Sequence, residues 1–159
     1  MNYLINKIIT DLKSGLNKND VQYVYFGHSY SLPGDVLSKG AIEVIPISSE
    51  ITSVATGIID QVVNTLSVVL IKSFKSDAYI NASKETAADY LTRVMDGRLA
   101  DGSLKSNSIR YILRTNMKNY GTVQRNIGIE YNSNDSDYEG AATAKITLTQ
   151  EENNTQPIS

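Results

Sequence analysis

The sequence predicts an α+β domain: a mainly antiparallel sheet with an N-terminal helix and one central helix packed on one face. The chain has 159 residues, of which 41% are hydrophobic, and this suits a single domain with a substantial core. Strand-like segments come in two groups of three with a single helix between the groups, whereas a parallel sheet would need a helix between successive strands. We expect residues 1–150 to form this domain and residues 151–159 to be a flexible polar tail.

The first half of the chain is predicted to form a helix followed by three strands. The helix covers residues 4–16, where the apolar side chains fall on one helical stripe. The strands are expected where β-branched and aromatic residues concentrate, at residues 21–26, 41–47 and 65–74. The two connections that flank the second strand are rich in Gly, Ser and other small polar residues, so both are predicted to be loops.

The second half is predicted to contain one helix and three more strands. In residues 84–96 the apolar positions recur at i, i+3, i+4, i+7 and i+8, and Gly97 supplies the stop. Apolar and polar residues alternate at residues 108–114, 123–131 and 142–149, which predicts three half-buried strands.

Composition excludes several kinds of chemistry. The chain has no Cys and a single His, so thiolate metal sites, disulfides, Cys nucleophiles and multi-histidine metal sites are excluded. His28 lies near Ser29 and Asp35 in one loop, but no nucleophile-elbow motif exists, so we expect a solvated histidine. Glycine-rich phosphate-binding motifs are also missing. We therefore expect a protein that is not an enzyme and needs no metal or cofactor.

Membrane and nucleic-acid binding are not predicted. The most apolar run, residues 66–71, is far shorter than the roughly 20 residues of a membrane helix. The first apolar patch is interrupted by polar and charged residues, unlike a signal peptide. A formal net charge of −2 gives no overall basic signal for direct nucleic-acid recognition. We expect a soluble protein that assembles in a cytoplasm.

Charge is segregated along the chain. Residues 72–125 carry ten basic and five acidic side chains, a net charge of +5, whereas residues 130–152 carry six acidic and one basic, a net charge of −5. Either the two segments neutralise each other within one monomer, or opposite faces of identical subunits attract in a ring. The candidates for such a subunit interface are Arg110, Arg114 and Arg125 on one side and Asp135, Asp137 and Glu139 on the other.

The order of these elements resembles the small tail-terminator, or tail-completion, proteins of tailed bacteriophages. The resemblance runs from the helix at residues 4–16 through the strands at 41–47 and 65–74 to the helix at 84–96. It continues through Ser103-Leu104 to the strands that end near Thr149. It implies a hexameric ring that caps the tail tube, stops its polymerisation and provides the surface for joining the head or neck.

The resemblance also implies a place and partners. The ring would lie at the head-proximal end of the virion tail, contact the tail tube protein and a neck or head-completion protein, and could line a DNA channel. Two other functions remain open from the sequence. One is a different ring-forming neck or head-completion connector, and the other is a small enzyme with an unrecognised carboxylate site.

Overall fold

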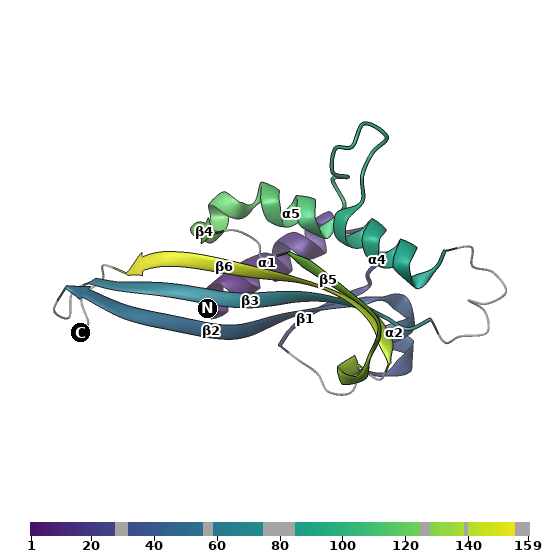
Figure 1. Cartoon of the computed structure of the whole chain (residues 1–159), viewed down its shortest axis with the longest axis horizontal. Helices are drawn as coiled ribbons and strands as arrows, with labels where there is room; N and C mark the ends of the chain where they lie inside the picture. Colours follow the sequence, from purple (N-terminus) through teal and green to yellow (C-terminus); the bar gives the residue numbers. More distant parts are fainter. Residues whose placement is uncertain (28–31, 56–58, 75–84, 125–127, 139, 155–159) are drawn as a thin grey trace.

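The computed structural model describes residues 1–27, 32–55, 59–74, 85–124, 128–138 and 140–154, and it contains one long sheet with a layer of helices (Figure 1). The helices are α1 (Asn2–Gly15), α2 (Gly34–Lys39), α4 (Ala87–Asp96) and α5 (Ile109–Thr115), with 3-10 turns η1 (Met117–Tyr120) and η2 (Ser136–Tyr138). The strands are β1 (Tyr23–Phe26), β2 (Ala41–Ala55), β3 (Ile59–Lys72), β4 (Thr122–Gln124), β5 (Ile129–Asp135) and β6 (Ala141–Asn154).

The sheet is mixed but mainly antiparallel, as the sequence predicts. Its order is β1-β2-β3-β6-β4, and β5 pairs with the other end of β6. Strand β1 runs parallel to β2, and every other pairing among the described residues is antiparallel. Strands β2, β3 and β6 are much longer than the rest and form the centre of the sheet.

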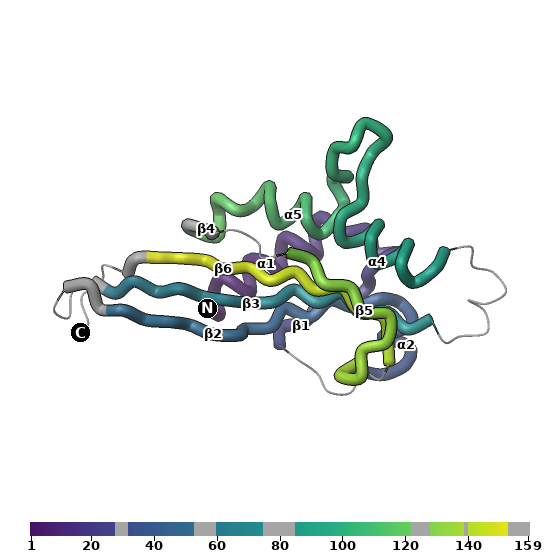
Figure 2. The backbone as a smooth tube through the Cα atoms, viewed as in Figure 1, coloured from purple at the N-terminus to yellow at the C-terminus, as the bar shows by residue number. Residues whose placement is uncertain are grey.

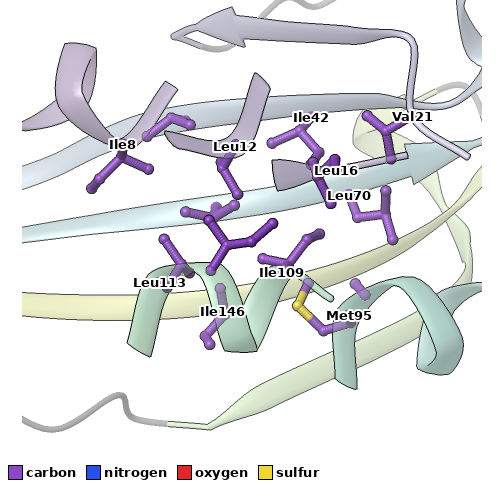
Figure 3. Close-up of a cluster of buried hydrophobic side chains, with 14 of the residues drawn as sticks. Ile8, Leu12, Leu16, Val21, Ile42, Leu70, Met95, Ile109, Leu113 and Ile146 are labelled. Atoms are coloured by element: carbon purple, nitrogen blue, oxygen red, sulfur yellow. The ribbon is translucent and has the colours of Figure 1, made fainter. Parts of the chain in front are cut away.

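The main core lies between one face of this sheet and helices α1, α4 and α5 (Figure 3). Helix α1 buries the apolar stripe that the sequence predicts, and alternate residues of β6 point into the same core. The side chains that meet there include Ile8 and Leu12 of α1, Ile42, Leu70 and Ile146 of the sheet, and Ile109 and Leu113 of α5. Burial of each large apolar side chain contributes roughly 1.5–3 kcal/mol, so this layer is the main source of stability.

A smaller apolar cluster lies on the opposite face, near one end of the sheet. Leu37 of α2 and Tyr138 of η2 pack there against Val69 and Ile71. The prediction of helices on one face is therefore correct for α1 and α4, while α2 belongs to the other side. The sequence places a loop there, but Pro33 precedes a short helical turn that buries Val36 and Leu37.

Strand β2 is longer than predicted and has an open edge. Residues 48–55, expected to be a loop, pair with β3 because their Ser, Thr and Ile side chains suit an exposed strand. Strand β1 covers the outer edge of β2 only at residues 41–44, and beyond them no described strand pairs with that edge. Pro46 lies at that uncovered edge, and the register with β3 shifts between Pro46 and Ser48, leaving Ile47 exposed.

The predicted strand at residues 108–114 is wrong, because this segment forms helix α5. The Ser108 hydroxyl accepts a hydrogen bond from the Tyr111 N–H at 3.3 Å, which caps the helix. Ile109, Ile112 and Leu113 are buried at helical spacing, whereas Tyr111, which the alternation placed inside, is exposed. The apolar residues of this segment fit both the two-residue period of a strand and the period of a helix, and the segment forms a helix because that conformation packs them on the sheet.

Three other boundaries differ from the prediction. Helix α4 begins at Ala87, where Thr86 and Asp89 form a capping box, and it ends at Gly97 as predicted. The single strand expected at residues 123–131 is divided into β4 and β5. Strand β6 continues to Asn154, so residues 151–154 of the predicted flexible tail pair with β3 instead.

Truncation of Leu91 tests whether α4 is a core element. Leu91 is 2% exposed, so Leu91→Ala should lower the free energy of unfolding by about 2–5 kcal/mol. Leu99→Ala is the matched control, since Leu99 is 53% exposed, and it should change stability by about 0.5 kcal/mol or less. Urea unfolding followed by circular dichroism measures both, and equal effects would show that α4 does not anchor the core.

Candidate assembly surfaces

The three central strands extend beyond the helical layer as a ribbon (Figure 2). We define the ribbon as residues 48–55 of β2, 59–65 of β3 and 149–154 of β6. Its ionisable side chains are all acidic, and the ribbon sequence contains no Lys or Arg. The acidic residues are Glu50, Asp60, Glu151 and Glu152.

Strand register distributes the four carboxylates over both faces of the ribbon. Glu152 lies opposite Val62 and Val62 opposite Ile51, so Glu152 and Ile51 share the face on which the helices pack. Asp60 lies two residues before Val62 and shares this face too. Glu50 and Glu151 flank Val63 on the opposite face. The ribbon is therefore negatively charged on either side.

A row of hydrogen-bonded polar side chains, of which Asn64 and Gln150 are buried, joins the base of the ribbon to the helical layer, and we call it the amide ladder. The Ser49 hydroxyl donates to Asn64 Oδ1 at 2.6 Å, and Asn64 Nδ2 donates to Gln150 Oε1 at 2.7 Å. Gln150 Nε2 donates to the Tyr120 carbonyl at 2.9 Å. The ladder crosses β2, β3 and β6, and it occupies the position where the apolar core ends.

Tyr120 connects this ladder to helix α1. Its hydroxyl donates a hydrogen bond to Asp11 Oδ2 at 2.7 Å, while its backbone carbonyl accepts one from Gln150 Nε2. Burial raises the pKa of Tyr120 well above its ordinary value, and the hydrogen bond to Asp11 raises it further. The hydroxyl therefore stays protonated and remains a donor at physiological pH.

Helix α5 and turn η1 form a surface of the opposite charge. From Ile109 to Tyr120 the sequence contains three basic residues and no acidic one. Arg110 Nη1 forms an ion pair with Asp96 Oδ1 at 3.0 Å. Arg114 and Lys118 are exposed instead. Among the described residues, no carboxylate lies within ion-pair distance of either. We call Tyr111, Arg114 and Lys118 the basic face.

Two hollows border these surfaces. One, of about 200 Å³, lies beneath Arg110 and Arg114 and is lined by Leu113 and Met117 of the helical layer and by apolar residues of β6. The other, of about 320 Å³, lies where the N-terminus of α1 meets Gln150 and Glu152 of β6. Both lie on the helical side of the sheet, and they add apolar surface beside the charged groups.

The structure separates the interface residues that the sequence predicts. Arg110 is held within the monomer by Asp96, Arg114 is exposed on α5, and Asp137 is exposed on η2. Asp135, another predicted interface residue, is buried, with 5% of its surface exposed. Its carboxylate accepts from the Thr143 hydroxyl at 3.1 Å and lies 3.5 Å from Lys145 Nζ. It therefore stabilises the β5–β6 hairpin. Arg125 and Glu139, like His28, lie outside the described residues.

Sequence reasoning missed the ribbon, although one signal could have revealed it. No Lys or Arg occurs from residue 41 to residue 71, and three acidic residues do. Among the described residues, no ion pair joins the basic segment 72–125 to the acidic segment 130–152. The acidic ribbon therefore draws only Glu151 and Glu152 from the acidic segment of the sequence, and Glu50 and Asp60 come from β2 and β3.

Comparison with known proteins identifies no family: no protein-family model matches the sequence, and no curated protein is detectably similar to it. Within the described part of the chain, no helix has the length and apolar character to cross a membrane. The same residues contain no cluster of three or more His, Asp or Glu side chains placed to bind a metal ion. The function must therefore be argued from the architecture and its surfaces.

Removal of the Gln150 amide tests the ladder. Gln150→Ala leaves the Tyr120 carbonyl and the Asn64 amide without their buried partner, which should cost about 1–3 kcal/mol of stability. Gln22→Ala removes an exposed glutamine side chain and should change stability by about 0.5 kcal/mol or less. If chemical denaturation shows the two variants to be equally stable, the ladder does not hold the ribbon.

Alkaline pH tests the buried tyrosines. Burial raises the pKa of Tyr90, Tyr120 and Tyr138 above the ordinary value of 10.0. The unfolded chain loses these protons near pH 10 while the folded chain keeps them, so their stabilising contribution is complete below pH 10 and declines above it. Unfolding free energies at pH 8 to 11 should fall steeply above pH 10, and Tyr120→Phe should reduce that slope. An unchanged slope in this variant would contradict the assignment to Tyr120.

Proposed function

We propose that this protein is a structural assembly protein of a phage tail, which forms a ring on the head-proximal end of the tail tube. The ring stops tube polymerisation and provides the surface to which a neck or head-completion protein binds. The resemblance to tail-terminator proteins supports this proposal, and so does the presence of its expected N-terminal helix, central helix α4 and long strands β3 and β6.

The observation that carries the proposal is the ribbon. The ribbon is mostly polar in sequence, and the described side chains that it buries fully are those of Asn64 and Gln150, so it buries little apolar surface within its own chain. Its open β2 edge has unpaired backbone groups along residues that no described strand covers. Such a projecting element is suited to contact with another chain, and an assembly role uses it.

The two charged surfaces support a ring in particular. The ribbon is acidic and α5–η1 is basic, so one chain carries two different and complementary surfaces. Contacts between unlike surfaces of identical subunits are head-to-tail, and they close into a ring when the rotation between neighbours permits. The function then depends on shape and binding, and the proposal assigns no catalytic residue, cofactor or metal.

Electron microscopy of tails tests the proposal. We expect gold-labelled protein, added to tail tubes of the phage that encodes it, to bind at one end of each tube. Deletion of the gene should give tubes of irregular length that lack heads. Labelling of tail-less heads instead would identify a neck or head-completion connector, and binding to neither structure would refute the assembly role.

A further inference from the structure

We propose that the ribbon of one subunit docks on the basic face of the next subunit, so that each ring contact joins an acidic strand surface to a basic helical surface. This inference rests on the proposed ring function. The occupant of the ribbon face is thus a second copy of this chain. The docking face of the ribbon is the one that carries Ile51, Asp60 and Glu152.

The two surfaces match in composition as well as in charge. On the ribbon, Ile51 is 67% exposed. Glu152 lies in the same row across the strands as Ile51, and Asp60 lies in the next row on the same face. On the basic face, Tyr111 is 36% exposed. Arg114 lies one turn further along α5, and the exposed Lys118 lies in the adjoining turn η1. Each side thus offers one large apolar group and two charges of one sign.

The positions of the two surfaces make the contact head-to-tail. The ribbon projects past the helices at one end of the sheet, whereas α5 lies over the middle of the sheet (Figure 1). A chain using both surfaces therefore binds one neighbour through its ribbon and another through its helices, which is the arrangement that a closed ring repeats. Opposite charges also accelerate encounter and disfavour contact between two ribbons or two basic faces.

The amide ladder prepares the ribbon for this contact. It fixes Ser49, Asn64 and Gln150 at the base, immediately before the row that contains Ile51 and Glu152. Because the strands are already paired and in register there, docking does not have to order a free chain, and the entropy loss on association is smaller.

Paired charge reversals test the docking surfaces. The ribbon variant is Asp60→Lys with Glu152→Lys, and the face variant is Arg114→Glu with Lys118→Glu. Each alone brings like charges together and should weaken self-association at least tenfold, as measured by sedimentation of the purified full chain with and without tail tubes. An equimolar mixture should recover the wild-type assembly, because each variant then meets a complementary neighbour on both sides.

Glu50→Lys is the matched control for Glu152→Lys. Both glutamates are exposed on the ribbon and both substitutions change the net charge equally, but Glu50 lies on the opposite face. We expect Glu152→Lys to weaken association and Glu50→Lys to change it less than twofold, with thermal unfolding confirming that both variants fold.

The outcomes separate this inference from the function on which it rests. If the mixture does not recover assembly, or if Glu50→Lys acts as strongly as Glu152→Lys, the ribbon face is not the docking surface, although the ring remains. A wild-type chain that stays monomeric both alone and with tail tubes would overturn the ring function and this interface together.

Discussion

The continuous antiparallel pairing of β3 with β6 is the constraint on which the rest of the structure depends. It runs without a register shift from Asp60 opposite Asn154 to Lys72 opposite Ala142. Because side chains alternate between the faces of a sheet, a slip of one residue would move every apolar side chain of β6 to the wrong face. The same pairing therefore determines where α1, α4 and α5 can pack and which of the carboxylates of β3 and β6 lie on each face of the ribbon.

Along this one pair of strands the side chains form three regions: apolar, buried polar and acidic. At one end the apolar residues of both strands meet the helices, and at the other the carboxylates meet solvent. Asn64 and Gln150 form the boundary, where a buried hydrogen bond replaces apolar packing. A polar pair of this kind tolerates few alternative registers, since a shifted strand would leave both amides buried without partners. Asn64 and Gln150, which lie where the apolar core ends, thus also hold the ribbon in register.

The parts of the fold that the sequence predicts are those in which local and tertiary preferences agree. The stripe at residues 4–16 and the alternation at 142–149 each fit one period and one environment. Residues 108–114 fit two periods, and only packing against Ile146 and its neighbours decides for the helix. The strand at residues 48–55 has no apolar face of its own, so hydrophobic periodicity could not reveal it. The acidic ribbon escaped prediction for a different reason, because it combines residues from three strands that are distant in the sequence.

The break at Pro46 in the outer edge of β2 has a consequence for solubility. An uncovered strand edge is a template on which identical chains can add without limit, and proline, which has no N–H to donate, interrupts such growth. The register shift beside Pro46 and the exposed Ile47 distort the same edge further. Edge-to-edge addition of identical chains is thereby disfavoured, while a contact through side-chain faces is left unhindered. The irregularity in β2 thus protects the open edge of the sheet against aggregation.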